Sequence, residues 1–157
     1  MKIAIGSDHG GYTLKEELAS YLRTQGHDVH DLGTHSTDAC DYPDYAFLVA
    51  AAVAEGQCEL GVMIDGAGIG SAMVANKVPG IRAGITNDVA AASNARQHNK
   101  ANVVTLGAKV VTPSLAKEIL NTVLKTAFEE RHQGRIDKIT RLEQRFLASA
   151  TEHRGRR

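Results

Sequence analysis

The sequence shows neither an excess of one charge nor a long apolar run, and we expect no signal peptide from its first residues. It contains 18 Lys and Arg against 18 Asp and Glu, so its formal net charge is zero, which argues against a nucleic-acid or membrane-surface partner. No apolar stretch approaches the ~20 residues that a membrane-spanning helix needs. The N-terminus runs straight into Gly6-Ser7-Asp8 without the apolar region of a signal peptide. We therefore expect a cytoplasmic protein that does not bind a membrane.

Cysteine is scarce, since Cys40 and Cys58 are the only two, and their spacing is not that of a metal site. Both are better interpreted as reduced bystanders than as a disulfide. Hydrophobic residues, in contrast, make up 43% of the 157 residues, which is enough for one compact domain with a sizeable core. We place that domain at residues 1–150, including a C-terminal helix, and we expect residues 151–157 to form a short frayed basic tail.

Short apolar runs alternate with longer amphipathic segments along the chain. The short runs predict strands at residues 2–6, 27–32, 60–64, 81–85 and 102–106. The amphipathic segments predict helices, of which one begins at the capping pair Thr112-Pro113 and the last carries Ile136, Ile139, Leu142 and Phe146. This alternation predicts an α/β fold with a five-stranded parallel sheet flanked by helices on both faces. Such sheets bind ligands at the carboxyl ends of their strands.

The segment 61–70 is the most informative part of the chain. An apolar strand ends in Asp65, and Gly66, Gly68 and Gly70 follow at every second position before a helical pattern begins. Glycine lets the backbone approach a ligand closely, and the amides at a helix start point at negative charge. A carboxylate here would repel a resident phosphate, so we expect this loop to hold a group that becomes negative only during a reaction. Asp65 would alternatively serve as a helix cap.

The same glycine loop differs from a dinucleotide-binding fingerprint. Its spacing is G-x-G-x-G rather than G-x-G-x-x-G, and it follows the third strand rather than the first. Asp88 lies at a suitable distance along the chain, but beside Asn87 it is typical of a helix cap. A nucleotide-binding function is therefore disfavoured.

Other polar residues have both a functional and a structural interpretation. Asp8 and His9 follow the first strand, at the same sheet edge as Asp65, which favours a shared site over a simple cap. Tyr42 can lend a hydroxyl to a sugar, although Pro43 and Asp44 beside it are ordinary helix openers.

Two further groups lie near helix ends. His98 and Asn99 end a helix, where a histidine would also complement the helix dipole. Arg131 and Arg135 can grip a phosphate together, or can be surface charge.

Taken together and in order, these motifs resemble those of the B-type ribose-5-phosphate isomerases and their galactose-6-phosphate isomerase relatives. The resemblance spans residues 1 to about 145 and rests on Gly6-Ser7-Asp8-His9-Gly10-Gly11, Asp41-Tyr42-Pro43-Asp44, the glycine loop running into Ala75-Asn76-Lys77, Gly80-Ile81-Arg82-Ala83, Arg96-Gln97-His98-Asn99 with Asn102-Val103, and Arg131 with Arg135.

The resemblance implies a Rossmann-like three-layer sandwich and an aldose–ketose isomerase of a phosphorylated sugar, with ribose 5-phosphate and ribulose 5-phosphate as the first choice of substrates. The reaction would proceed by ring opening and a cis-enediolate. A homodimer or a dimer of dimers with active sites at the subunit interface is also implied, with no metal and no cofactor. Two alternatives remain: an isomerase of a tetrose or hexose phosphate, and a sugar-phosphate-binding protein without catalysis.

The resemblance also implies roles for individual residues. Asp8 and His9 would contact the sugar with Tyr42 nearby, and His98 would assist ring opening while Asn99 holds a substrate oxygen. Arg131 and Arg135 would hold the phosphate, and Lys109 stands where the family often has Arg. The backbone amides of the loop would stabilise the enediolate, from residues Gly66, Ala67, Gly68, Ile69 and Gly70.

This chain departs from the family pattern at the catalytic base. Many members have Cys at the position of Asp65 and Thr at that of Ala67, and another branch uses Glu at the position of Ser71. Asp65 is therefore the only acid at the family's known base positions. A carboxylate can take a proton from one carbon and return it to the next, while the developing enediolate faces the loop amides.

The order of elements also predicts that two chains build one site. Asp8 and Asp65 follow their strands and so lie at the carboxyl edge of the sheet. His98 and Asn99 precede a strand, which places them toward the opposite edge. A two-fold partner would bring the two groups together.

Overall fold

The computed structural model describes residues 1–154, with side chains described through residue 150. In chain order the elements are β1 (Lys2–Ser7), α1 (Tyr12–Thr24), β2 (Asp28–Asp31), α2 (Tyr42–Ala54), β3 (Leu60–Asp65), α3 (Ile69–Ala75), β4 (Ala83–Ile85), α4 (Val89–Gln97), β5 (Val103–Gly107), α5 (Pro113–Lys125), the 3-10 turn η1 (Glu130–His132) and α6 (Gln133–Arg154). Within the described residues, none of these helices combines the length and apolarity that crossing a bilayer requires.

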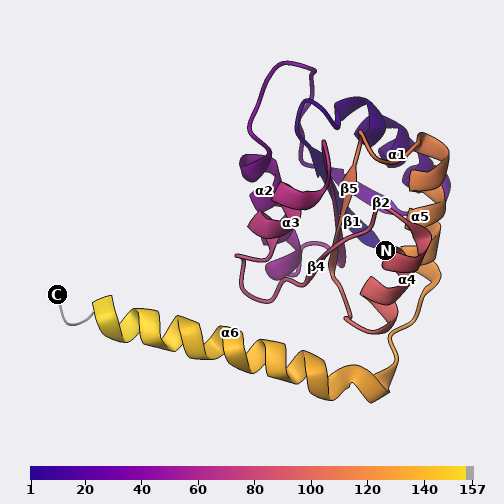
Figure 1. The fold of residues 1–157 in the computed structure, drawn as a ribbon. Coiled ribbons are helices and arrows are strands. Elements are labelled where there is room, and N and C mark those ends of the chain that lie inside the picture. Colours follow the sequence, from indigo (N-terminus) through magenta and orange to yellow (C-terminus); the bar gives the residue numbers. More distant parts are fainter. Residues whose placement is uncertain (155–157) are drawn as a thin grey trace.

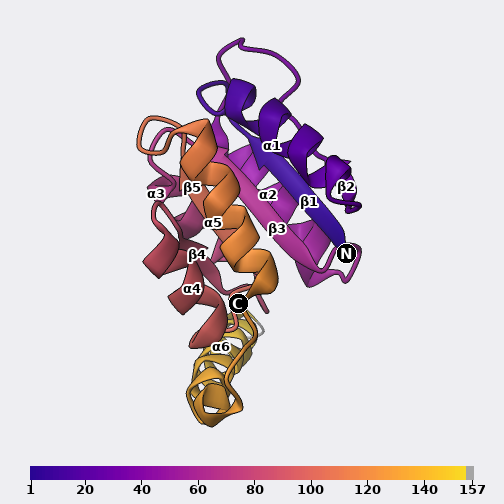
Figure 2. The ribbon, with the colours of Figure 1, turned by 90° about the vertical axis from the view of Figure 1, so that its right-hand side faces the viewer.

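The strands form one parallel sheet in the order β2-β1-β3-β5-β4. Helices α1, α4 and α5 cover one face and α2 and α3 cover the other, and Figure 2 shows α1 and α5 in front of the sheet. The predicted α/β fold with a parallel sheet between two helical layers is therefore confirmed.

Side chains that alternate along each strand supply the two halves of the core, because successive strand residues point to opposite faces. Ile3 and Ile5 of β1 pack with α1, α4 and α5, whereas Ala4 packs with the residues of α2. Met63 of β3 points to the α2 side and its neighbours Val62 and Ile64 to the other. This double burial explains why the central strands β1 and β3 have nearly continuous apolar sequences.

The predicted strand at residues 81–85 is shorter in the structure. Strand β4 contains only Ala83–Ile85. The Ile81 amide donates instead to the Val78 carbonyl (3.1 Å) in a turn. The Arg82 amide donates to the Asn102 side chain (2.8 Å). Turn and side-chain bonds thus replace the start of the strand ladder.

The parallel sheet has a carboxyl edge, where all strands end, and an amino edge, where they begin. The chain leaves β1 for β2 on one side and returns to β3 on the other side of β1. A doubly wound sheet opens a crevice at such a reversal, at its carboxyl edge. The loops that follow β1 and β3 place Asp8 and the glycine loop at this carboxyl edge.

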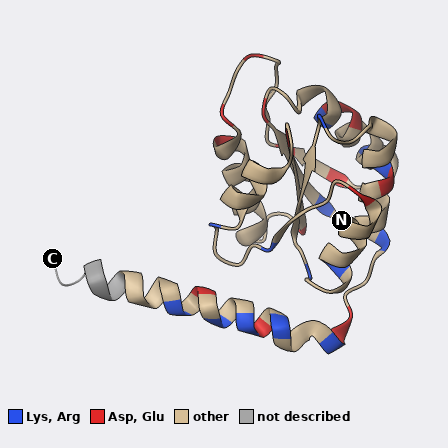
Figure 3. Cartoon of the chain, in the orientation of Figure 1, with Lys and Arg blue, Asp and Glu red and all other residues tan. Residues whose placement is uncertain are grey.

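Helix α6 does not pack on the sheet and leaves the body as an arm (Figure 1). Ile136 at its start is 4% exposed, but Leu142 is 56% and Phe146 is 73% exposed. Figure 3 shows Lys and Arg recurring along the same helix. Its backbone is helical up to Arg154. Residues 155–157, which end the basic tail predicted at 151–157, lie outside the described residues.

Candidate active site

The carboxyl edge brings Asp8 and Asp65 together. Ser7 pairs with Ile64 in the ladder between β1 and β3, so the residues that follow them are neighbours. The Asp8 amide donates to the Ile64 carbonyl (3.2 Å). The Asp8 carboxylate is buried and accepts a hydrogen bond from the Gly11 amide (3.0 Å). The prediction that the two acids lie at the same edge of the sheet is confirmed.

His9, Tyr42 and Lys109 lie at the same carboxyl edge of the sheet. The His9 Nδ1 atom lies 3.1 Å from the Cys40 carbonyl oxygen, which ties the loop before α2 to the end of β1. The Tyr42 ring covers Gly70 so closely that a Cβ there would lie 2.6 Å from the Tyr42 Cζ atom. The Lys109 amide donates to the Gly66 carbonyl (3.0 Å). These residues form the carboxyl-edge group together with Asp8, Asp65 and the glycine loop.

The Asp65 carboxylate is turned into the glycine loop and is 4% exposed. Its Oδ1 atom accepts hydrogen bonds from the amides of Ala67 (3.0 Å) and Gly68. Its Oδ2 atom accepts from the Ser71 amide (3.0 Å) and the Ser71 hydroxyl (2.6 Å). Asp65 thus has the capping contacts that its residue type predicts, and its role as a base stays a prediction.

Two residues that the sequence analysis did not single out hold the loop from the side of β5. The Thr105 hydroxyl donates to the Gly68 carbonyl (2.6 Å). The Asn87 amide donates to the Ala67 carbonyl (2.9 Å), and its oxygen accepts from the Gly107 amide (2.7 Å). Asn87 precedes Asp88, whose predicted cap is confirmed by its bond from the Ala91 amide (2.7 Å). Nothing local in the sequence marks Asn87 or Thr105, because their partners are distant along the chain.

The remaining predicted site residues gather at the amino edge. His98 ends α4, and its ring centroid lies 4.4 Å from that of His132 in η1. Gln97 donates to the Glu129 carboxylate, which also accepts from Arg131 (Nε–Oε2 2.5 Å). Arg135 follows one turn later, with Nη1 3.3 Å from the His132 Nδ1 atom. We call His98, Asn99, Arg131, His132 and Arg135 the amino-edge group.

His132 was missed by the sequence analysis, although it is 5% exposed. Its Nε2 atom has no hydrogen-bond partner among the described residues and lies 3.6 Å from the Glu129 carboxylate. Burial lowers the pKa of the His132 imidazole, and the positive charge of Arg131 acts in the same direction. The hydrogen bond from Arg131 lowers the pKa of the Glu129 carboxyl. At neutral pH the amino-edge group therefore combines a neutral buried imidazole and two guanidinium groups, with the Glu129 carboxylate beside them.

The amino-edge group was also assessed as a metal site. One atom from each of His98, Glu129 and His132 lies within 4.8 Å of the others. However, the Nδ1 atoms of both rings face N–H donors, from Asn94 and Arg135. A neutral ring that accepts at Nδ1 carries its proton on Nε2 and has no free lone pair for a metal. With two guanidinium groups nearby, this chemistry suits an anionic ligand better than a cation.

The two groups occupy opposite edges of one subunit, as their places in the sequence predict. All strands run in parallel, so the loops after β1, β3 and β5 lie at one end. The loop before β5, together with η1 after α5, lies at the other. One chain brings together the residues within each group but does not join the two groups.

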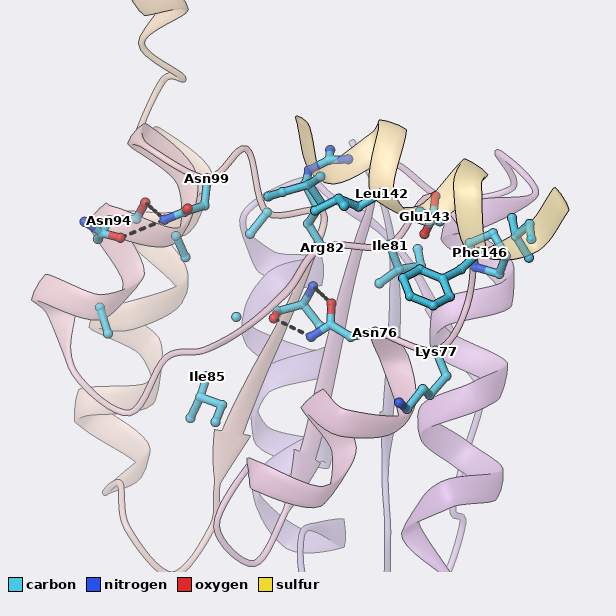
Figure 4. A pocket seen from close by; sticks show the side chains of 18 of the residues that line it. Asn76, Lys77, Ile81, Arg82, Ile85, Asn94, Asn99, Leu142, Glu143 and Phe146 are labelled. Atoms are coloured by element: carbon cyan, nitrogen blue, oxygen red, sulfur yellow. Dashed lines mark hydrogen bonds between the residues drawn. The ribbon is translucent and has the colours of Figure 1, made fainter. Parts of the chain in front are cut away.

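A groove of about 1170 Å³ lies between the arm α6 and the body. Figure 4 shows Leu142 and Phe146 above Ile81 on one side of it, and Asn94 and Asn99 on the other. Asn76 spans the middle through paired bonds with the Ala83 backbone (2.8 and 2.9 Å). The groove is lined by apolar residues of α6 and reaches the amino-edge group through Asn99.

Similarity to known proteins extends over nearly the whole chain. The model of the Ribose/Galactose Isomerase family matches residues 3–139. The chain is 45% identical over 145 residues to ribose-5-phosphate isomerase B of Escherichia coli K12, which covers 92% of this chain and 97% of that protein.

Solved structures agree. Ribose-5-phosphate isomerase B of Clostridium thermocellum superposes with a TM-score of 0.91 at 47% identity, covering 93% of this chain and 99% of that chain. The Mycoplasma genitalium protein with bound ribulose-5-phosphate gives a TM-score of 0.88 at 45% identity, covering 91% and 96%. The fold and the family expected from the sequence are confirmed, and this chain belongs to the Ribose/Galactose Isomerase family.

Proposed function

We propose that this chain is an aldose–ketose isomerase that interconverts ribose 5-phosphate and ribulose 5-phosphate. The observation that carries the proposal is the 45% identity, over 92% of the chain, to a ribose-5-phosphate isomerase B. A structure of a similar protein has ribulose-5-phosphate bound. The enzyme class predicted from the sequence is in accord with both. A cytoplasmic location and a role in pentose phosphate metabolism belong to the same proposal.

The direct test is a panel of aldose phosphates assayed for ketose formation. Ribose 5-phosphate, a tetrose 4-phosphate and two hexose 6-phosphates would be compared at equal concentration. The proposal expects the highest kcat/KM with ribose 5-phosphate. A higher kcat/KM with another sugar phosphate of the panel would change the substrate that we assign. Binding of all the sugar phosphates without turnover would reject the enzyme assignment.

We assign the carbon-acid base to Asp65. The base must take the proton from C2 of the open aldose and deliver it to C1, which converts the aldehyde into the ketose through an enediolate. Asp65 is the acid of the glycine loop, and the loop amides of Gly66, Ile69 and Gly70 are not among the donors that it engages. Those amides would face the negative enediolate oxygens.

The Ser71 hydroxyl gives Asp65 a partner in both protonation states. It donates to Oδ2 across 2.6 Å while Asp65 is a carboxylate. A hydroxyl both donates and accepts, so it can rotate and accept a bond from the protonated acid. The backbone amides that hold Asp65 lack this freedom. A hydrogen bond between Asp65 and Ser71 is therefore possible both before and after proton uptake on Oδ2.

The amino-edge group would supply the rest of the chemistry. His98 would assist opening of the sugar ring, and Asn99 would hold a substrate oxygen. Arg131 and Arg135 are exposed, planar and separated by one helical turn, which suits a phosphate dianion. Asp8, His9 and Tyr42 would contact the sugar from the carboxyl edge, with Lys109 beside the loop. No metal or cofactor has a part in the proposed reaction.

A complete site needs a second copy of the chain. The support is the separation of the two groups on opposite edges of the sheet, together with the apolar arm α6, whose exposed Leu142 and Phe146 border the groove. An isologous partner would cover this apolar surface and repeat each pairing of groups twice. The proposed assembly is a homodimer, or a dimer of dimers, with active sites at the subunit interface.

The non-catalytic alternative has one observation in its favour. All the hydrogen bonds that the Asp65 carboxylate accepts in the structure come from residues 67–71 of its own strand-to-helix segment, and a capping acid needs no catalytic role. Exchange of the C1 hydrogen of ribulose 5-phosphate with deuterated water separates the two functions. A binding protein would leave this hydrogen unexchanged.

A further inference from the structure

Asn94 of α4 links the two residues that end the helix. The Asn99 Nδ2 atom donates to the Asn94 Oδ1 atom across 2.8 Å, and the Asn94 Nδ2 atom lies 3.0 Å from the His98 Nδ1 atom. Figure 4 shows the bonds between Asn94 and Asn99 beside the groove. The spacing of four residues brings Asn94 and His98 to one face of the helix. The sequence analysis gave Asn94 no role.

The main-chain carbonyl of Asn94 shows which atom donates in each of these hydrogen bonds. Asn99 Nδ2 also lies 3.3 Å from the Asn94 main-chain oxygen, and a carbonyl oxygen only accepts. Asn99 must therefore turn its NH₂ group toward Asn94. The Asn94 side chain then presents its oxygen to Asn99, which leaves its NH₂ group facing His98.

An NH₂ group that faces Nδ1 determines where the His98 proton sits. The neutral imidazole has one N–H and one bare nitrogen. A donor at Nδ1 requires the bare nitrogen there, and the proton then occupies Nε2. The other tautomer would set two donors against each other, which costs the hydrogen bond and leaves a polar group unpaired.

We propose that Asn94 is a positioning residue for His98, which it holds in the form that carries the proton on Nε2 and so offers a hydrogen-bond donor to the ring oxygen of a cyclic sugar phosphate. This role rests on the proposed function of His98 in ring opening. A neutral imidazole N–H is a known stabiliser of negative charge on oxygen in isomerase chemistry. The proton position itself is a property of the free protein.

The first test is nitrogen NMR of the histidine rings. In the wild-type protein at neutral pH, His98 is expected to show the shift pattern of the Nε2–H form. Asn94→Asp replaces the donor by an acceptor, so His98 should move to the Nδ1–H or doubly protonated form. Asn121→Asp adds the same charge on α5 and should leave His98 unchanged. A wild-type His98 with its proton on Nδ1, or an unchanged pattern in Asn94→Asp, would overturn the proposal.

The second test separates ring opening from proton transfer between carbons. Ribulose 5-phosphate cannot close a furanose ring because its C5 oxygen carries the phosphate, so exchange of its C1 hydrogen needs no ring opening. Asn94→Asp and Asn94→Leu should lower kcat for ribose 5-phosphate by at least about tenfold and leave the C1 exchange rate nearly unchanged. Equal loss in both reactions would show that Asn94 supports the fold of the site and would refute the positioning role. A changed tautomer with both rates intact would instead refute the assignment of His98 to ring opening.

Discussion

At the scale of single residues, Asp65 shows most clearly what the sequence predicts and what only the structure reveals. The residue type and its place after a strand were enough to predict an acid beside the glycine loop. The four donors around its carboxylate were not predictable, because they depend on how the chain turns between Gly66 and Ser71. A structural cap and a base therefore share one side chain in the proposed reaction.

Replacement of Asp65 tests its role as the base. Asp65→Asn should lower kcat by at least ~10²-fold, a usual loss for a general base, and C2 hydrogen exchange of the substrate should fall with it. Asp65→Cys supplies the thiol found in many family members and should retain more turnover than Asp65→Asn. Ribulose 5-phosphate binding, measured by calorimetry, should persist in both. Near-normal turnover in Asp65→Asn would remove the assignment.

Arg131 should act on the phosphate and not on the sugar. Arg131→Ala removes a planar, charged donor, so the Kd for ribulose 5-phosphate should rise by at least about tenfold. Binding of unphosphorylated ribulose should hardly change. Arg141→Ala, an exposed arginine further along α6, is the matched control and should leave both affinities unchanged. If Arg131→Ala weakened the binding of both ligands equally, the role of the arginine would be structural.

Lys15 and Asp31 form a largely buried ion pair that supports the start of the loop before α2. Lys15 is 0% exposed, and its ammonium group lies 2.6 Å from one Asp31 oxygen and 2.7 Å from the other. Asp31 also accepts from the Gly33 amide (3.0 Å). Burial by itself raises the pKa of the Asp31 carboxyl, but the bonds from Lys15 and Gly33 outweigh it and hold that pKa below the ordinary value.

Lys15→Met should therefore destabilise the protein by about 3 kcal/mol at neutral pH, since it leaves a carboxylate without its charged partner. Because the Asp31 pKa is lowered by folding, its ionisation stabilises the fold above the unfolded pKa of about 4, and this is lost as the pH falls through the folded value. Chemical denaturation of the wild type and of Lys15→Met, at pH 7 and in acid, should show that their difference in free energy of unfolding becomes smaller in acid. A constant difference would contradict the role of the charge, and Lys15→Met with Asp31→Asn should recover part of the loss.

At the scale of elements, the sequence predicted all five strands, and the signal was clearest for β1, β3 and β5, whose residues are buried on both faces of the sheet. It misjudged ends such as residues 81–82, where bonds to Val78 and to the Asn102 side chain replace the strand ladder. The places of the site residues followed from the order of strands and helices. His132, Asn87 and Thr105 were missed because their contacts come from segments far apart in the sequence, and periodicity does not record these.

Gly68 shows how β5 fixes the glycine loop. Its φ angle is +80°, and a Cβ would lie 3.2 to 3.3 Å from the backbone of Leu106 and Gly107. Gly80 has a similar φ of +82°, but no described heavy atom lies within 4 Å of a Cβ there. Gly80→Ala should cost about 1–2 kcal/mol for the left-handed backbone alone.

Gly68→Ala should cost more, by about 1–3 kcal/mol of overpacking, since the strand backbone cannot move aside. It should also lower kcat, whereas Gly80→Ala should not. Chemical denaturation and turnover assays of the two variants make the comparison. Equal losses of stability would mean that β5 does not constrain the loop.

At the scale of the whole molecule, α6 is the element whose sequence misleads when one chain is considered alone. Its apolar spacing is that of a helix packed on a core, yet exposure rises from Ile136 to Phe146 as the arm leaves the body. A stripe of this kind is typical of a surface that a partner covers. The same partner would bring its amino-edge group to the carboxyl-edge group of this chain. The central claim is therefore that one active site contains residues of two chains.

Complementation between two inactive variants tests this claim most directly. Asp65→Ala and His98→Ala would be mixed in equal amounts, unfolded together, refolded and assayed with ribose 5-phosphate. A mixed dimer has one site with both defects and one with neither, so random pairing should restore about a quarter of the wild-type activity. Each variant refolded alone should stay inactive. If the mixture remained inactive although mixed dimers were shown to form by mass spectrometry, both residues would belong to a site within one chain, and the account of a shared site would be wrong.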